Sequence, residues 1–407
     1  FPKLLQAAGY RTAIIGKWHL ESTPTGFDYY SYHIGQGTYY NPDFIEPDGT
    51  HRYEGYATDL TVENSLKWLS GREKDKPFCL MMHFKAPHRN WLPAPGKMDM
   101  YEDTTFPVPE NFWDDYAGRQ AAAEQKMSID KDLEVGWDLK VADGSDGWGR
   151  AEKGELARMT AAQRAAFDKV YVPLSDQFNK AALSGRELVE YKYQRYLRDY
   201  MKVISSVDDA VGRMLDYLKA QGLDKNTIVI YTSDQGFYLG EHGWFDKRFM
   251  YEESFRTPML VRYPGRIPAG RKSAALVQNI DIAPTLLDYA GIAVPADIQG
   301  ESMRPVLSGE AKAIRPSLYY HYYEFPQPHA VKRHYGVRTD SYKLIHFYYD
   351  IDKWELYDLK KDPHEMRNVI DDPAYMKVVV SLMAEIDRLQ VKYEDTNPTG
   401  DYDGWAK

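Results

Sequence analysis

Residues 228–248 read IVIYTSDQGFYLGEHGWFDKR. The stretch opens, together with Thr227, as a short apolar run of β-branched side chains, which predicts a strand buried on both faces. Ser233-Asp234-Gln235-Gly236 follows at once. In open α/β sheets, ligands bind just beyond the carboxyl ends of the strands. The stretch therefore predicts an α/β fold with a polar site after this strand.

Two more strands are expected in the large amino-terminal part of the chain, at residues 10–15 and 78–84. Each also ends in polar residues, the first in Gly16-Lys17-Trp18-His19-Leu20 and the second in Lys85-Ala86-Pro87-His88. Helices are predicted around the strands because apolar residues recur at three- and four-residue steps. These helices cover residues 2–9, 58–69, 187–221 and 281–290. Residues 26–56 are predicted to form a long ordered loop, and 114–185 an insertion with short helices.

The composition changes near residues 308–316. Beyond this point, short strands alternate with turns, and an apolar stripe predicts one terminal helix. The expected strands are 318–323, 335–338, 343–349 and 354–358, and the helix is 376–391. We therefore predict a large domain over residues 1–310 and a smaller antiparallel subdomain with a packing helix over residues 311–407.

Composition excludes several classes of protein. The chain has 407 residues and a net charge of −9, which argues against a nucleic-acid partner because phosphate backbones select basic faces. No apolar run approaches the roughly 18 residues of a membrane span, so no membrane partner is expected. The only cysteine, Cys79, lies inside the apolar run 78–82 and is interpreted as a small buried thiol rather than a nucleophile.

The polar strand ends indicate the chemistry. Asp234 and Gln235 offer oxygen ligands, which suit a hard cation such as Ca²⁺ or Mg²⁺, whereas a zinc site would be expected to include His or Cys. Lys17, Lys247 and Arg248, together with the histidines, would add positive charge. This combination predicts a pocket for a tetrahedral, multiply charged anion, such as a sulfate or phosphate ester. Histidine is the usual residue for moving a proton at such a site.

The segment Gly9–Leu20, GYRTAIIGKWHL, resembles the second signature of the type I, formylglycine-dependent sulfatases, G-Y-x-T-x-x-x-G-K-x-H-L. Ala86-Pro87-His88, the SDQG…GEHGWFDKR block and residues 354–368, WELYDLKKDPHEMRN, fit the same family in the same order. The resemblance implies an alkaline-phosphatase-like fold, in which helices sandwich a large mixed sheet next to a smaller C-terminal antiparallel sheet with a helix.

The resemblance also implies a formylglycine nucleophile and one calcium ion. By motif, Lys17 and Lys247 would bind sulfate oxygens, His19 would support the nucleophile and His88 would be the general acid. Asp234 and Gln235 would be two calcium ligands. The family makes its nucleophile within C/S-x-P-x-R, a motif that this sequence lacks. Because Phe1–Leu5 reads like the interior of a helix, we expect the nucleophile and the first metal aspartates to lie upstream of Phe1.

Within the family, Gly35–Phe44, the FDKR ending and Tyr322–Thr339 look most like N-acetylglucosamine-6-sulfatase-type enzymes that act on host glycans. The expected substrate-binding residues each have a structural alternative. Asp246 and Arg248 form a sugar contact or a surface ion pair. His242 is a site residue or a structural histidine. His329, Arg333 and His334 close the sugar pocket or pack against a neighbouring domain.

The expected partners are a sulfated saccharide and a formylglycine-generating maturation enzyme, and the family implies a periplasmic or secreted location. Two other functions stay open. A phosphomonoesterase or phosphonate hydrolase of the same superfamily would be expected to use two transition metals and a histidine where Gln235 stands. A non-catalytic sulfoglycan-binding protein would lack the nucleophile.

Overall fold

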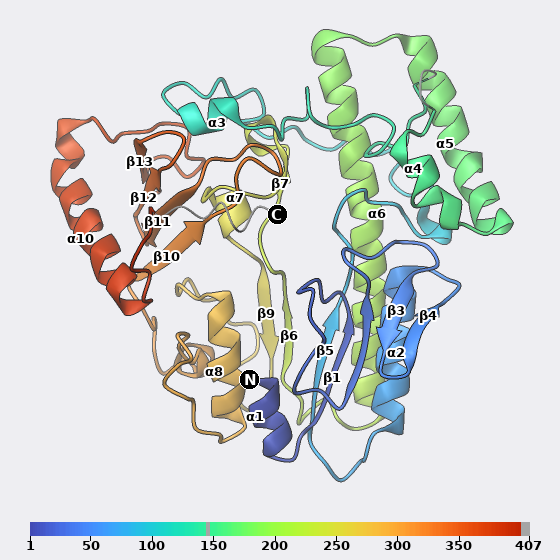
Figure 1. Ribbon diagram of the computed structural model, residues 1–407, viewed down its shortest axis with the longest axis horizontal. Helices are drawn as coiled ribbons and strands as arrows, with labels where there is room; N and C mark the ends of the chain where they lie inside the picture. Colours follow the sequence, from blue (N-terminus) through green and yellow to red (C-terminus); the bar gives the residue numbers. More distant parts are fainter. Residues whose placement is uncertain (144–146, 400–407) are drawn as a thin grey trace. The chain divides into compact units, whose positions relative to one another are not determined.

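The computed structural model describes residues 1–143 and 147–399, and the chain divides into two compact units (Figure 1). Unit 1 comprises Phe1–Pro107, Leu133–Asn226 and Ala290–Ile292. Unit 2 comprises Val108–Asp132, Thr227–Tyr289 and Ala293–Lys407. The chain passes between the units several times, so neither unit is one continuous segment. The predicted domain boundary at residue 310 stays a prediction.

Unit 1 is built on a mixed five-stranded sheet with the order β4-β3-β2-β1-β5. β1 runs parallel to both of its neighbours, β2 and β5. On the other side of β2, β3 pairs antiparallel with β2 and β4 pairs antiparallel with β3. The large mixed sheet expected from the sequence is thus confirmed. The strands are β1 (Arg11–Gly16), β2 (Tyr29–His33), β3 (Asp43–Glu46), β4 (Gly49–Arg52) and β5 (Phe78–His83).

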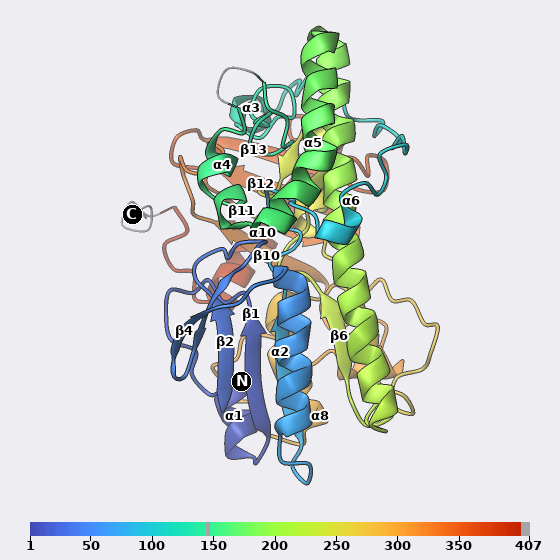
Figure 2. The same ribbon diagram turned by 90° about the vertical axis from the view of Figure 1, so that its right-hand side faces the viewer.

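One long helix packs on this sheet, and a second, longer helix lies alongside the first (Figure 2). α2 (Ala57–Gly71) packs against β1 and β5, and α6 (Gly185–Ala220) packs against α2. One apolar face of α6 is buried, as its periodicity predicts, although Leu215 of the predicted stripe is exposed. The remaining helices of unit 1 are α1 (Pro2–Ala7), η1 (Pro95–Lys97), α4 (Arg150–Lys153), η2 (Leu156–Arg158) and α5 (Ala161–Ala181).

Two parts of unit 1 are more regular than the sequence suggested. The expected loop 26–56 contains β2, β3 and β4, and its β3–β4 hairpin is polar because most of β4 faces solvent. The expected insertion contains the 21-residue helix α5. This helix begins with a capping box, in which the side chains of Thr160 and Gln163 each accept a hydrogen bond from the other residue's backbone amide. Apolar periodicity does not reveal such a start.

Unit 2 contains β6 (Val229–Thr232), the strand predicted at the start of the 228–248 stretch. It pairs antiparallel with β9 (Met259–Arg262), and its four residues are only partly buried. The strand is confirmed, but burial on both faces is not, because a β-branched run specifies an extended backbone without specifying its partners. Around it lie α3 (Gln120–Glu124), β7 (Tyr238–Leu239), η3 (Glu241–Gly243), β8 (Phe245–Asp246), α7 (Glu252–Phe255), η4 (Asn279–Asp281), α8 (Ile282–Tyr289) and α9 (Arg304–Ser308).

The C-terminal part of unit 2 is a four-stranded antiparallel meander covered by one helix. Val337, Leu344 and Leu356 from the sheet pack against Val379 and Leu382 from the helix. The predicted small antiparallel sheet with its packing helix is therefore confirmed. Its elements are β10 (Ser317–Tyr322), β11 (His334–Thr339), β12 (Tyr342–Phe347), β13 (Lys353–Asp358), η5 (Pro373–Tyr375) and α10 (Met376–Lys392).

Across residues 1–143 and 147–399, no helix combines the length and the apolar character needed to cross a membrane.

Candidate functional site

The end of β1 is joined to the end of β5 at a close backbone contact in unit 1. Gly16 lies opposite His83, and a Cβ atom at Gly16 would meet the His83 carbonyl oxygen at 1.8 Å. The Lys17 amide donates to this oxygen at 2.8 Å, and Nδ1 of His83 donates back to the Lys17 carbonyl at 3.1 Å. Only glycine allows the approach, so the G-K pair of the signature sets the direction in which Lys17 leaves the sheet.

His19 is held by the loop that follows β2. Its backbone is left-handed, with φ of 48°, and its Nδ1 lies 3.0 Å from Nε2 of Gln36. The side-chain amide is a donor, so Nδ1 accepts and the proton of the neutral ring lies on Nε2. Residues 17 and 19 are thus both fixed by backbone or side-chain contacts, although the loop itself has no regular structure.

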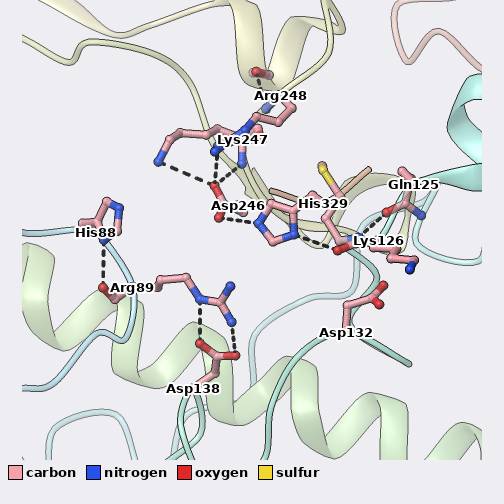
Figure 3. Close-up of polar contacts among 12 residues, drawn as sticks. His88, Arg89, Gln125, Lys126, Asp132, Asp138, Asp246, Lys247, Arg248 and His329 are labelled. Carbon is pink, nitrogen blue, oxygen red and sulfur yellow. Dashed lines mark hydrogen bonds and ion pairs between the residues drawn. The ribbon is translucent and has the colours of Figure 1, made fainter. Parts of the chain in front are cut away.

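His88 follows β5 and is oriented by its neighbour Arg89 (Figure 3). Its Nδ1 lies 2.9 Å from the Arg89 carbonyl oxygen, which can only accept, so Nδ1 carries a proton. A charged His88 would therefore hold its second, transferable proton on Nε2. The Arg89 guanidinium in turn makes a bidentate ion pair with the buried carboxylate of Asp138, at 2.9 and 2.5 Å.

The surroundings of these residues are electropositive. His33 is 1% exposed, and its burial, followed by the charges of Lys85 and Lys17, lowers its pKa to about 3. It is therefore neutral at physiological pH. Cys79, inside β5, has its pKa raised to about 11, chiefly by burial. That fits the interpretation of Cys79 as an inert thiol, because a nucleophilic cysteine needs a lowered pKa.

The metal candidates of unit 2 lie where β6 ends. The Asp234 carboxylate is exposed, and the Asp234 carbonyl accepts a hydrogen bond from Nδ2 of Asn279 at 2.7 Å. Gly236 approaches the next segment so closely that a Cβ atom there would meet the Glu253 carbonyl oxygen at 2.0 Å. The turn is thus held on both sides of Gln235.

Asp246, Lys247 and Arg248 form a sharply folded polar turn at the end of β8 (Figure 3). Asp246 and Arg248 have φ of 71° and 138°, so the backbone doubles back around Lys247. The Asp246 carboxylate contacts both neighbours, with Oδ1 lying 3.6 Å from Nζ of Lys247 and 3.3 Å from Nη1 of Arg248. The other oxygen, Oδ2, lies 2.9 Å from Nε2 of His329, whose Nδ1 contacts the Lys126 carbonyl at 2.7 Å.

Asp246 stays ionised inside this turn. Its burial opposes the charge, but the hydrogen bond from His329 and the charges of Lys247 and Arg248 outweigh it and hold its pKa well below the usual range. The turn therefore presents a fixed anion between two cations. This arrangement suits hydroxyl groups, which donate to a carboxylate and accept from a guanidinium.

The other three predicted substrate residues are buried. His242 is fully buried, with Nδ1 2.7 Å from the Asp114 carboxylate and Nε2 3.8 Å from Glu253. His334 is also fully buried, and its Nδ1 contacts the Lys332 carbonyl at 2.7 Å. Arg333 is 1% exposed, and its Nε donates to the Tyr323 carbonyl at 2.7 Å.

The structure thus brings His329 to the Asp246 turn and joins Lys17 to the end of β5. Several residues in these contacts carried no recognised signal in the sequence. They are His33, Asp114, Lys126, Asp138 and Asn279. Asp114 and Lys126 contribute only through tertiary contacts, from a segment expected to be irregular.

A hard cation fits the chemistry of Asp234 and Gln235, since both offer oxygen ligands and calcium takes six to eight of them. Among the described residues, one group of three possible ligand side chains lies close enough to share an ion: Glu46, Asp48 and His51 in the β3–β4 hairpin. These side chains already have protein partners, because His51 pairs with Asp48 at 3.0 Å and Glu46 accepts from Ser31 at 2.8 Å.

Two family models match the chain. The model described as Sulfatase matches residues 1–292, and the model described as N-sulphoglucosamine sulphohydrolase, C-terminal, matches residues 240–392. Together they cover residues 1–392, which include every predicted site residue.

Individual relatives agree with the family match. The N-acetylglucosamine-6-O-sulfatase of Bacteroides thetaiotaomicron is 50% identical over 98% of this chain and 73% of its own length. An arylsulfatase of Clostridium perfringens is 27% identical, and the match covers 84% of this chain and 60% of the relative. A solved structure of a protein in complex with its substrate, D-glucosamine-2-N,6-O-disulfate, superimposes with a TM-score of 0.95. It is 49% identical to this chain, and the match covers 98% of this chain and 83% of the solved one.

Proposed function

The chain belongs to the sulfatase family, and from that premise we propose that it hydrolyses the 6-O-sulfate ester of N-acetylglucosamine in a sulfated glycan. The observation that carries the proposal is the 50% identity, over 98% of the chain, to an N-acetylglucosamine-6-O-sulfatase. The Asp246–Lys247–Arg248 turn supports it, because a cation suited to sulfate lies between two groups suited to sugar hydroxyls.

Lys17 and Lys247 bind the sulfate oxygens in this proposal. Each is fixed by its backbone, Lys17 by the contact with His83 and Lys247 by its amide, which donates to Asp246 Oδ1 at 2.7 Å. Fixed cations lower the cost of the negative charge that develops on the oxygens in the transition state. His19 orients the nucleophile through Nε2, since Nδ1 is engaged by Gln36.

His88 is the general acid. Its Nδ1 proton is held by the Arg89 carbonyl, so a proton on Nε2 is the one available to the leaving sugar oxygen. The Asp138–Arg89 ion pair restrains the residue that orients it. An alkoxide is a poor leaving group in water, which is why a sugar sulfate needs an acid at this position.

Asp246, Arg248 and His329 bind the sugar ring and thereby place its 6-position at the sulfate site. His242, Arg333 and His334 remain candidates for substrate binding. Their burial favours an indirect role, in which each stabilises the backbone behind a residue that touches the sugar. His242, tied to Asp114 and adjacent to Glu253, would hold the turn between Gly236 and Asp246.

The proposal includes one calcium ion held in part by Asp234 and Gln235, and a formylglycine nucleophile. The ion would neutralise sulfate oxygens, and the formylglycine hydrate would supply the attacking oxygen. A maturation enzyme and export to the periplasm or the medium belong to the same proposal, since they are typical of the family.

The test is sulfate release by the full-length, matured enzyme from N-acetylglucosamine 6-sulfate, compared with the 3-sulfate and with the corresponding 6-phosphate. We expect release from the 6-sulfate alone. Preferred cleavage of the phosphate, with two zinc ions bound, would instead establish the phosphatase alternative. Binding of the 6-sulfate without release would establish a sulfoglycan-binding protein.

A further inference from the structure

Unit 1 contains a polar pocket next to His88, and most of its lining residues have no role in the site described above. Its volume is about 610 Å³, which is far larger than one sulfate group. Four parts of the chain form it: the loop after β2, the loop after β5, Trp137, and the stretch through α4 and η2. All of its lining residues belong to unit 1.

The wall of this pocket is cationic. Five of its lining residues are lysine or arginine, and a single one is an acid. The bases are Lys85, Arg89, Arg150, Lys153 and Arg158, and the acid is Glu155. The sign of this cluster is opposite to the net charge of the whole chain, which is −9. A concave surface lined by one sign of charge concentrates ligands of the opposite sign.

The carboxylates that pair with Arg89 and Arg158 do not line the pocket. Asp138 pairs with Arg89, and Asp43 pairs with Arg158 at 2.7 Å. Arg158 is further fixed by donating to the Tyr40 and Asn41 carbonyls. These contacts orient the guanidinium groups before any ligand arrives, which lowers the entropy cost of binding.

The floor and the rim of the pocket differ. At the floor, Lys85 and Glu155 are buried, and their charged groups lie 4.0 Å apart, so they largely satisfy each other. At the rim, Lys153 is exposed and makes no ion pair within the described part of the chain. Arg150, also at the rim, pairs with Glu134 at 2.6 Å and lies over the ring of Trp137. A ligand that enters the pocket would therefore meet the positive charge of Lys153 at the rim.

We propose that this pocket binds a second anionic group of the saccharide, beyond the sulfate that is cleaved. The inference rests on the proposed function, because His88 lines the pocket and also donates the proton to the sugar oxygen. The second group is either a sulfamate on the same sugar or the carboxylate of an adjoining uronic acid. Both are planar or tetrahedral oxyanions that arginine and lysine bind by charge and hydrogen bonds. The enzyme thereby prefers multiply anionic saccharides.

The test compares three substrates with the full-length, matured enzyme. They are N-acetylglucosamine 6-sulfate, glucosamine 2-N,6-O-disulfate, and a disaccharide of N-acetylglucosamine 6-sulfate linked to a uronic acid. We measure the kcat/KM of each anionic substrate relative to the monosulfate in the wild type, in Lys153→Glu and in Lys153→Ala. Lys180→Glu is the matched control, an exposed lysine on α5 outside the pocket.

We expect Lys153→Glu to lower the kcat/KM ratio about five- to tenfold for one of the two anionic substrates, and Lys153→Ala to lower it less. The substrate affected identifies the source of the second anion. Higher ionic strength should shrink the wild-type preference, because salt screens partly exposed charges. Equal ratios in the wild type and both Lys153 variants would overturn the inference. No sulfate release from any substrate by the wild type would instead overturn the proposed function.

Discussion

Asp246 and His329 are 83 residues apart in the chain, yet Nε2 of His329 lies 2.9 Å from Oδ2 of Asp246. The histidine comes from the loop between β10 and β11, and the aspartate ends β8. The same histidine is fixed from its other side by the Lys126 carbonyl. A loop of the C-terminal part thus determines the position of a residue in the proposed sugar site.

Replacing His329 should therefore weaken sugar binding. We expect His329→Ala to lower kcat/KM about ten- to a hundredfold, mostly through KM, because a hydrogen bond to a charged group is worth about 1.5–3 kcal/mol. Steady-state kinetics on N-acetylglucosamine 6-sulfate measure this loss. His364→Ala, at an exposed histidine of the same unit, is the control and should behave as the wild type. A fall in kcat with KM unchanged would contradict a binding role.

The contribution of His88 to kcat should be larger for substrates whose leaving group must be protonated. We expect His88→Ala to reduce kcat on the sugar sulfate by about 10²–10⁴-fold. The loss should be much smaller on 4-nitrophenyl sulfate, whose leaving group departs without protonation. His51→Ala, in the β3–β4 hairpin, serves as the control. Equal losses on both substrates would show that His88 does not act as the acid.

The raised pKa of Glu253 predicts that the stability of the protein depends on pH. Its burial, followed by the charge of Glu365, raises its pKa to about 8, above the usual value for a glutamate. Between about pH 4.5 and pH 8, this carboxyl is therefore protonated in the folded state and ionised in the unfolded state. Because the unfolded state binds fewer protons, the free energy of unfolding falls as the pH rises through this range. Glu253→Gln keeps the neutral shape and should raise the free energy of unfolding at pH 8 by about 1–3 kcal/mol.

Urea denaturation of both proteins at pH 5 and pH 8 tests this prediction. The difference between Glu253→Gln and the wild type should be small at pH 5 and clear at pH 8. A constant difference at both pH values would mean that Glu253 does not titrate in this range.

Gly16 should tolerate no side chain. Gly16→Ala would place Cβ 1.8 Å from the His83 carbonyl oxygen at a φ of 106°, so the β1 and β5 ends must separate. We expect a loss of more than about 3 kcal/mol in the free energy of unfolding, together with loss of turnover as Lys17 moves. Gly71→Ala is the control, because a Cβ atom at Gly71 meets no other atom within 4 Å. Unchanged thermal unfolding of Gly16→Ala would contradict the close contact.

Removal of the metal should abolish turnover. We expect a calcium chelator to stop sulfate release and added Ca²⁺ to restore it, because Asp234 and Gln235 offer oxygen ligands that suit a hard cation. Asp234→Asn should raise the Ca²⁺ concentration needed for restoration. Restoration by zinc but not by calcium would contradict this assignment.

The sequence predicted most of the regular elements because they obey local rules. The apolar periodicity of α6 and α10 is a local pattern, and so are the apolar runs of β1 and β5. The β3–β4 hairpin and α5 were missed. The hairpin gives a weak signal because β4 is polar and mostly solvent-facing. The start of α5 is marked by a capping box and not by an apolar stripe.

The sequence by itself determined the family, the order of the polar strand ends and the residue types available for an oxyanion and a hard cation. These properties depend on motifs within single segments. Only the tertiary structure decided which residues hold the site residues in place. His329 contacts Asp246, Asp138 pairs with Arg89, and Asp114 contacts His242. It also decided that six charged residues line one pocket beside His88. Such contacts join segments tens to more than a hundred residues apart, and no local propensity or spacing encodes a distance across that much chain.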